Sequence, residues 1–212
     1  DAELEFDGEL TNLASTGLIF ARDALLRFNG GLINAGSVAL SFGITDIFGD
    51  IENQNGASMV ISGGSDATLV DDVVNDGMIR VSQGSAAVFF GAVSGGGSFP
   101  GSGTVFFEGD LRPGTSPAQI NFGGDLVLGT FSTLEIEIGG TQPGTEHDQL
   151  VVAGDVSLGG TLVVKLIDGF VPSAGQSFPV IRYASHSGWF SSIEIPVVSA
   201  LCIEVGEESA GV

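Results

Sequence analysis

The amino-acid sequence predicts an all-β protein folded as a parallel β-helix, or β-solenoid, with rungs of about 20 residues. Three observations lead to this fold class. The composition is 43% hydrophobic and only 15% charged, with 34 glycines, and residues that favour helices are scarce. Short runs of Val, Ile, Leu and Phe alternate with glycine-rich turns, as strands in an all-β chain do. Finally, matched residues recur at a nearly constant spacing through the first hundred positions.

The first recurring element is an asparagine that ends a short apolar or β-type pair. It appears in "ELTN", "LIN", "IEN" and "VVN", at spacings of 22, 19 and 22 residues. Side chains that repeat once per rung become neighbours in a solenoid, because each rung stacks on the next about 4.8 Å away. We therefore expect a polar ladder at one corner, where each amide bonds turn backbone and its neighbour. Its members are Asn12, Asn34, Asn53 and Asn75.

Glycines and a second apolar position repeat with the same period. Glycines at 43, 63 and 84 follow short strands and predict turns with positive φ. Residues at the end of a third apolar run are 20, 21 and 21 positions apart, and we expect them to stack in the core. This expected apolar ladder consists of Phe28, Phe48, Leu69 and Phe90, with Val81 and Val88 also facing inward. Each rung then holds about three short strands, too short to pair as hairpins within one rung. A β-sandwich with coincidental spacing and a leucine-rich repeat both explain these registers less well.

The period weakens beyond about residue 100, which suggests two regions: residues 1–108 as the solenoid repeat region and residues 109–212 as a β-rich C-terminal region. Alternating strands are expected at 132–138, 147–152, 160–167 and 177–184. In "STLEIEI", Leu and Ile alternate with Glu135 and Glu137, as in a sheet with one face in water. This region is expected either to continue the solenoid irregularly or to cap it as a β-sandwich-like unit, and the sequence favours the cap.

The second half resembles the C-terminal passenger region of large bacterial surface proteins. The matching pieces are "LRPGTSPA", "STLEIEIGG", "HDQLVVAGDVSLGGTL" and "DGFVPSAGQSFPVI", and the N-terminal "G-x-L-x-N-x-G" style repeats match the same group. The resemblance to these bacterial exported β-solenoid proteins, autotransporter-like or anchor-sorted, covers about residues 8–192. It implies secretion, an extracellular or bacterial cell-surface location and a body without catalytic activity. The membrane barrel and anchor of that group are missing from this sequence.

Several carboxylates recur with the rung period and are the candidate metal ligands. Asp46 is 20 residues before Asp66, and Asp50 is 21 before Asp71, with Asp72 beside it. Stacked like charges repel, so solvent, a raised pKa or a bound cation should relieve them. The alternatives are a solvated acidic edge, a calcium site built from oxygen ligands, and the acidic residues of a polysaccharide-cleaving β-helix enzyme. The calcium-binding glycine-rich nonapeptide is not present.

Other chemistry-bearing residues give weaker signals. Two places carry residue types found in hydrolase sites: His147 with Asp148, and His186 between Ser185 and Ser187. The sequence has no oxyanion-hole signature, so we expect no catalytic residue. "GAVSGGGSFPGSG" lacks the Lys-Ser/Thr of a phosphate loop, and we expect no cofactor apart from calcium. Trp189 and Tyr183 are the single Trp and the single Tyr of the sequence. In one interpretation the exposed Trp stacks on a sugar, and in the other it closes the end of the β-core.

The formal net charge of −20 disfavours nucleic-acid partners, and no apolar run is long enough for membrane insertion. The function expected from the sequence is a non-enzymatic extracellular structural protein, a rod that self-associates head to tail through its solenoid ends. The alternatives are an adhesin or module that binds cell-surface glycan and, less favoured, a polysaccharide-active β-helix enzyme.

Overall fold

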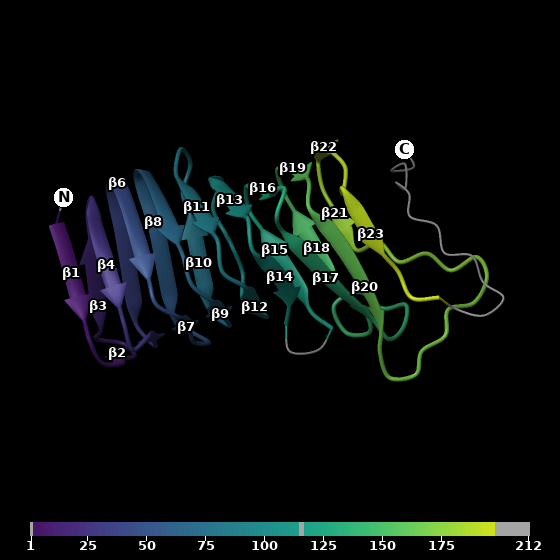
Figure 1. Ribbon diagram of the computed structural model, residues 1–212, viewed down its shortest axis with the longest axis horizontal. Helices are drawn as coiled ribbons and strands as arrows, with labels where there is room; N and C mark the ends of the chain where they lie inside the picture. The colour runs from purple at the N-terminus through teal and green to yellow at the C-terminus, as the bar shows by residue number, and fades with distance from the viewer. Residues whose placement is uncertain (1, 115–116, 198–212) are drawn as a thin grey trace.

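A computed structural model describes residues 2–114 and 117–197, and every element in these ranges is a β-strand. Figure 1 shows the strands side by side along one long axis, with the chain advancing from one end to the other. All pairings between strands are parallel, and each strand pairs with its counterpart in the next rung. The β-solenoid fold is therefore confirmed. Within the described part of the chain, no helical segment has the length and hydropathy needed to cross a membrane.

Two long sheets form two faces of the solenoid. The first has the order β1-β4-β6-β8-β11-β13-β16-β19-β22, with β3 pairing β6 and β10 pairing β8. Its strands are β1 (Ala2–Phe6), β3 (Leu18–Ala21), β4 (Ala24–Phe28), β6 (Ser37–Phe48), β8 (Ser58–Leu69), β10 (Met78–Val81), β11 (Ala86–Phe89), β13 (Thr104–Phe107), β16 (Asp125–Leu128), β19 (Asp155–Leu158) and β22 (Ser185–Gly188).

The second sheet has the order β2-β5-β7-β9-β12-β14-β17-β20-β23. Its strands are β2 (Leu10–Asn12), β5 (Leu32–Asn34), β7 (Ile51–Asn53), β9 (Val73–Asn75), β12 (Val93–Gly95), β14 (Asp110–Pro113), β17 (Thr133–Ile138), β20 (Thr161–Leu166) and β23 (Ser192–Glu194). A third sheet contains β15 (Gln119–Phe122), β18 (Gln149–Val152) and β21 (Ile181–Arg182). The N-terminal rungs are built differently on this side. There β6 and β8 each continue through the corner as one strand of 12 residues.

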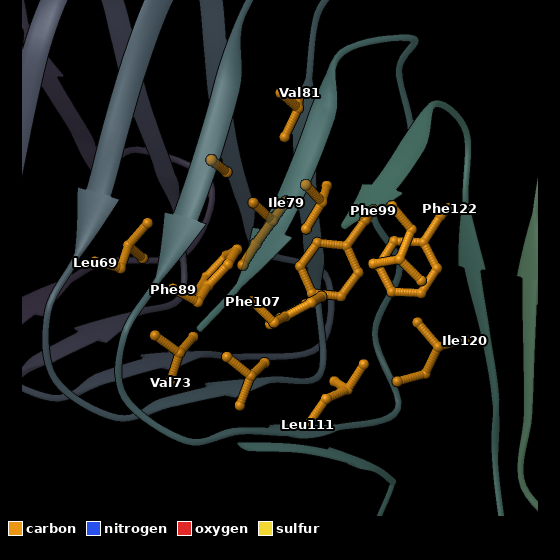
Figure 2. Packing of buried hydrophobic residues seen from close by; sticks show 14 of the residues in the cluster. Leu69, Val73, Ile79, Val81, Phe89, Phe99, Phe107, Leu111, Ile120 and Phe122 are labelled. Atoms are coloured by element: carbon orange, nitrogen blue, oxygen red, sulfur yellow. The ribbon is translucent and has the colours of Figure 1, made fainter. Parts of the chain in front are cut away.

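Alternate side chains of each strand point inward and form the core. Along the first sheet, the strand register connects one inward position from rung to rung. These neighbours are Leu26, Ile47, Leu69, Phe89, Phe107 and Leu128, and all are buried. Figure 2 shows three of them, Leu69, Phe89 and Phe107, pointing into the space between the sheets. Burial of this continuous apolar row is the main source of stability in such a stack.

The apolar ladder expected from the sequence is wrong in its register. Phe28 and Leu69 are buried, but Phe48 is half-buried beside Arg27, and Phe90 is 54% exposed. Leu69 pairs with Ile47 and Phe89, which are the residues directly before Phe48 and Phe90. A slip of one residue moves a strand side chain to the opposite face, so Phe48 and Phe90 face outward. Val81 faces inward as expected, whereas Val88 alternates with Phe89 and does not.

The slip at Phe48 has a local cause at the corner of the N-terminal rungs, whereas Phe90 is displaced because β8 and β11 pair without a bulge at a different offset. Between β6 and β8 the register shifts, because Ser41 pairs with Ser62 while Gly43 pairs with Ser65. The extra residue is accommodated at Gly63 and Gly64, both with positive φ, as at Gly43. Glycine adopts this left-handed conformation without the steric cost of a Cβ atom. A bulge of this kind makes constant spacing in the sequence an unreliable guide to neighbours in the fold.

Four phenylalanines fill the middle of the solenoid. Phe89 and Phe107 are stacked with ring centroids 5.1 Å apart, and Phe99 and Phe122 are stacked at 4.9 Å. The two stacks meet edge to face, with the rings of Phe99 and Phe107 5.9 Å apart at 88°. Figure 2 shows the four rings close together in the core. Their arrangement combines large buried area with the ring geometries that aromatic pairs prefer.

The asparagine ladder is confirmed. Each donor amide reaches the carbonyl oxygen of the next side chain, with Nδ2–Oδ1 distances of 2.7, 2.8 and 2.7 Å from Asn12 through Asn34 and Asn53 to Asn75. The same Nδ2 groups also donate to the backbone oxygens of Ser37, Ser58 and Met78. All four side chains are buried, so these bonds satisfy amides that would otherwise lose water without compensation. The ladder ends at Asn75, whose Nδ2 has no hydrogen-bond partner among the described atoms.

Residues beyond 108 continue the same sheets without interruption. β16, β19 and β22 extend the first sheet, and β14, β17, β20 and β23 extend the second. The β-sandwich-like cap favoured by the sequence is therefore wrong, and the irregular continuation is the arrangement that forms. What changes is rung length: Asp125, Asp155 and Ser185 are neighbours separated by 30 residues each. Longer loops carry the extra residues, and the alternation of Leu134, Ile136 and Ile138 with Glu135 and Glu137 is as expected.

Candidate functional site

The carboxylates singled out from the sequence do not form one stack. Asp46 pairs with Thr68, whereas Asp66 pairs with Ile44 and Ala86. Asp46 and Asp66 are thus two positions out of register, and the bulge at the β6–β8 corner accounts for one of the two. The expected stacking of this pair is wrong.

The other three candidate carboxylates bind backbone amides at a corner between the two long sheets. The N–H of Gly49 donates to Asp71 Oδ2 at 2.7 Å, and the N–H of Asp72 donates to Asp50 Oδ1 at 3.2 Å. Asp72 Oδ1 in turn accepts the N–H of Ala92 at 2.8 Å. Each carboxylate therefore caps the turn of an adjacent rung, and all three side chains remain exposed to solvent. Backbone N–H groups and water reduce the repulsion between these charges.

No group of three or more His, Cys, Asp or Glu side chains in residues 2–114 and 117–197 is arranged to hold a metal ion. Calcium binding by Asp46, Asp50, Asp66, Asp71 or Asp72 stays a prediction. Any calcium ion at the Asp50–Asp72 corner would use carboxylate oxygens left free by these backbone bonds, together with water.

A hollow of about 330 Å³ lies on the outer surface of the first sheet, over its C-terminal strands. It extends across β13, β16, β19 and β22, which Figure 1 shows next to one another near the C-terminal end. Its walls combine hydroxyl and carboxylate side chains with the apolar residues Leu126, Val127 and Val156. The polar lining residues are Thr104, Asp125, Asp155, Ser157, Ser185, His186 and Ser187.

Hydrogen bonds between rungs fix the carboxylates of this hollow. Asp125 Oδ1 accepts the backbone N–H of Asp155 at 2.9 Å, and Asp155 Oδ1 accepts the Ser185 hydroxyl at 2.6 Å. The two carboxylates are exposed to solvent. Ionised carboxylates held in this way are fixed acceptors for a hydroxyl or ammonium donor.

Three aromatic rings cluster at the C-terminal end of the first sheet, and of these three residues only His186 also lines the hollow. The Tyr183 and His186 rings are 5.1 Å apart, and the His186 and Trp189 rings are 6.5 Å apart. Trp189, directly after β22, is 41% exposed. Because His186 pairs with the buried Val156, this group also covers the end of the core. The packing of this group supports the interpretation in which it closes the end of the core, and sugar stacking by Trp189 stays a prediction.

His147 and Asp148 form a different buried polar group and not a hydrolase pair. The Asp148 carboxylate accepts the backbone N–H groups of Ala118 at 2.7 Å and Glu137 at 2.8 Å. His147 Nδ1 lies 3.1 Å from the carbonyl oxygen of Gly140, its ring packs on Phe178 with centroids 5.8 Å apart, and its Nε2 has no described partner. The carboxylate therefore orients backbone and not the imidazole.

Burial sets the protonation of this pair. Desolvation raises the pKa of Asp148 to about 6, against the lowering effect of the two backbone bonds and with smaller raising effects from Glu137 and Glu135. Desolvation lowers the pKa of His147, opposed by its bond to Gly140 and by the charge of Glu146. Both groups are driven toward the neutral form, as expected for ionisable side chains in the core.

A second, smaller hollow of about 180 Å³ adjoins Asp148 on the outer surface of the second sheet. Arg112, Glu135 and Glu137 line it, and Glu135 forms an ion pair with Lys165 at 2.7 Å. The sequence indicated only that Glu135 and Glu137 face water.

Sequence reasoning missed both hollows as sites, and one signal could have identified the first. Asp125, Asp155 and Ser185 each follow a short loop after an apolar strand, in "GGDLVL", "AGDVSL" and "YASHSG", at a spacing of 30 residues. A search restricted to the 20-residue period does not find this repeat. Comparison with known proteins finds no matching family model, no matching curated protein and no matching solved structure.

Proposed function

We propose that the protein is an extracellular structural component, a β-solenoid rod that serves as a surface scaffold or as the subunit of a filament or matrix. The observation that carries the proposal is the uninterrupted stacking of both long sheets from β1 to β22 and from β2 to β23. A solenoid of this kind is stabilised by contacts between neighbouring rungs, so it can be extended without changing its cross-section. The asparagine ladder supports the same role, because it satisfies one buried corner over four rungs.

The end of the solenoid at β1, β2 and β3 supports head-to-tail association. Each of these strands pairs with only one described strand, namely β4, β5 and β6. Leu4 has the same register position as the buried Leu26 but is 47% exposed. Unpaired strand edges beside exposed apolar side chains favour pairing with another rung. We propose that the partner is the opposite end of a second copy, a contact that does not close and so generates filaments.

The charge and the sequence resemblance support the location. A net charge of −20 keeps a glycine- and valine-rich β-protein dispersed in solution, and the repeats resemble those of exported bacterial passenger regions. We therefore propose an extracellular or bacterial cell-surface setting, with no nucleic-acid partner and no insertion in a membrane.

Electron microscopy tests the proposal directly. At increasing protein concentration, negatively stained samples should contain rods that lengthen in steps of one molecule, and light scattering should report a rising mass. Leu4→Glu should abolish this growth by placing a charge at the apolar end. Val74→Glu is the matched control, because Val74 is 40% exposed on the side of the rod, and it should leave growth intact. Particles of constant mass at all concentrations, or equal behaviour of the two variants, would contradict association through this end.

A second candidate function is glycan binding, as in an adhesin. The specific observation in its favour is the indole of Trp189, which is 41% exposed directly after β22. A glycan array should give binding that Trp189→Ala reduces. A polysaccharide-cleaving role is less supported, because Asp46 and Asp66 are out of register and Asp50, Asp71 and Asp72 bond turn backbone.

A further inference from the structure

We propose that copies of this chain also associate side by side, with the third side of one solenoid against an acidic corner of the next. This inference goes beyond the head-to-tail contact, because it uses the flank of the solenoid and not its ends. The third side contains β3, β10, β15, β18 and β21, together with the first halves of β6 and β8.

The third side carries no carboxylate on its strands. None of these strand segments contains Asp or Glu, although the chain has 26 such residues and a net charge of −20. One outward row runs from Phe20 through Ala39 and Val60 to Arg80. Leu18 and Phe20, at the N-terminal end of this side, are 66% and 63% exposed. The side is therefore a sheet surface with small and apolar side chains and without negative charge.

Arginines give the third side a positive charge. Three of the six basic residues of the chain lie on it or at its edge. Arg80 on β10 and Arg182 on β21 are exposed, and Arg22 directly follows β3, with its guanidinium 4.4 Å from the ring centroid of the exposed Phe42. Within the described ranges, none of the three forms an ion pair in its own copy. Their charge is therefore available to another molecule.

Carboxylates gather at the corner between the two long sheets. This acidic corner consists of Asp7, Glu9, Asp50, Asp71, Asp72 and Glu108, which lie in the turns that connect the first sheet to the second. The turns at residues 7–9, 29–31, 49–50, 70–72, 90–92 and 108–109 contain neither Lys nor Arg. Each rung has three sides, so the corner between two of them lies across the rung from the third. Each copy is therefore negative at one edge and carries arginines on the opposite side.

Charge complementarity identifies the partner as a second copy in this orientation. Contact through the outer faces of the long sheets would bring carboxylates such as Asp125 or Glu135 against one another. Contact between the third side and the acidic corner instead places guanidinium groups beside carboxylates, a pairing with strong charge-assisted hydrogen bonds. At physiological salt, charges more than about 8 Å apart are largely screened, so the groups at the contact outweigh the net charge.

The solenoid geometry extends this contact along the molecule. Rungs repeat at about 4.8 Å, so two parallel rods engage several rungs at once. The contact joins two different surfaces and does not close, because every copy keeps one free third side and one free acidic corner. Side-by-side association therefore produces layers of rods, a form of assembly suited to a matrix.

Sedimentation velocity with the Leu4→Glu variant tests the flank separately from the ends. In this variant the end contact should be lost, so a rise in mass reports contact through the flank. With increasing protein concentration at physiological salt, the weight-average mass should rise at least about twofold, and in about 1 M NaCl it should return to that of the monomer. Negatively stained samples should show rods of one molecule's length lying in parallel.

Charge variants in the Leu4→Glu protein identify the two surfaces. Arg80→Glu with Arg182→Glu should abolish the rise in mass. Arg112→Glu with Lys165→Glu makes the same change of charge on the second sheet, where both residues already have ion-pair partners, and should leave the rise intact. Melting temperatures verify that the variants are folded.

A charge exchange tests whether the two surfaces meet. Glu9→Lys with Asp50→Lys at the acidic corner should also abolish association, and mixing this variant with Arg80→Glu, Arg182→Glu should restore it, because opposite charges again face each other. Glu9→Gln with Asp50→Asn keeps the oxygen that accepts the N–H of Asp72 and should weaken association in the same direction, which covers the case in which the lysine variant does not fold.

Each outcome supports or overturns the inference. Constant mass of Leu4→Glu at all concentrations would overturn side-by-side association and leave end-to-end growth of the wild type as a separate question. Equal loss in the two arginine and lysine variants, or a mixture that stays monomeric, would overturn the assigned surfaces. Association that added salt strengthens would overturn its basis in charge.

Discussion

The N-terminal and C-terminal rungs use the same sheets but satisfy their buried polar groups in different ways. Between β2 and β9, rungs spaced by 19 to 22 residues share one asparagine ladder that runs from Asn12 to Asn75. Beyond β13, rungs spaced by up to 30 residues have no counterpart of that ladder in the described chain. Among the described residues, their buried polar side chains are Ser132, His147, Asp148 and Gln149, each of them bonded to backbone groups.

The difference shows what rung length demands. Short, nearly equal rungs place identical side chains in contact, so one residue type can supply donor and acceptor repeatedly. Longer rungs bring extra backbone inside, and each buried N–H or C=O then needs its own partner. Asp148 accepts two such N–H groups, and Gln149 Nε2 donates to the carbonyl oxygen of Pro179 at 2.7 Å. In the regular rungs, buried polar groups are therefore satisfied by the same hydrogen bond repeated from rung to rung. In the irregular rungs, each buried polar group has its own hydrogen-bond partner.

The largest effect should come from the aromatic cluster between the two regions. Phe107→Ala removes a fully buried ring that contacts Phe89, Phe99 and Phe122, and should lower the free energy of unfolding by about 3–5 kcal/mol in urea titrations. Phe90→Ala, on the outer face, should cost less than about 0.5 kcal/mol. Equal costs would contradict the observed register, in which Phe89 and not Phe90 faces the core.

A smaller effect is expected within the asparagine ladder. Asn53→Ala removes a side chain that accepts from Asn34 and donates to Asn75 and to the carbonyl of Met78, so it should cost about 2–4 kcal/mol. Asn75→Ala removes the end member, whose Nδ2 is unpaired, and should cost about 1–2 kcal/mol. Urea titration measures both. A larger cost at Asn75 than at Asn53 would show that the ladder does not act as a chain of bonds.

The C-terminal region should carry a pH dependence that the N-terminal ladder lacks. The pKa of Asp148 is raised to about 6 in the folded protein, so its contribution to stability is full below the ordinary value of 3.8 and is lost as pH rises through 6. The stability of the wild type relative to Asp148→Asn should fall by up to about 3 kcal/mol between pH 4 and pH 7.

His147, whose pKa is lowered, contributes in the opposite direction, because its share of stability is lost as pH falls below 6.5. It is present in both proteins, so comparing unfolding titrations of wild type and Asp148→Asn cancels its effect. Glu52→Gln is a control for charge removal at an exposed position. If the free energies of unfolding of wild type and Asp148→Asn changed by the same amount between pH 4 and pH 7, the buried, neutral state of the carboxyl group would be refuted.

The smallest effect is expected at the acidic corner of the N-terminal rungs. Because Asp50, Asp71 and Asp72 already accept backbone N–H groups, millimolar Ca²⁺ should raise the melting temperature of metal-free protein by no more than about 2 °C. A rise of many degrees, lost in Asp71→Asn with Asp72→Asn, would instead establish a calcium site there. Mg²⁺ at the same ionic strength controls for general screening.

Prediction from sequence succeeded where a residue type is tied to one place in the rung. Asparagines recur at the same corner because only a side chain with both donor and acceptor can bond its own copy above and below. The alternation in 132–138 also specified its buried face correctly. Prediction was wrong for Phe48, Phe90 and the Asp46–Asp66 pair, since each depended on counting a fixed number of residues per rung. The offset between paired residues changes at the β8 bulge, and it changes again between β8 and β11, where Leu69 pairs with Phe89. The hollow over β16, β19 and β22 was missed for a related reason, its period being 30 residues and not 20.

The sequence by itself determined the class of fold, the corner that holds the asparagines and the alternation of each strand, because these follow from local patterns of two to four residues and their repetition. Only the tertiary structure decided which side chains meet across rungs, which carboxylates bind backbone and where a hollow forms. Register between parallel strands depends on the length of every intervening loop, and one added residue exchanges the inward and outward faces of a strand.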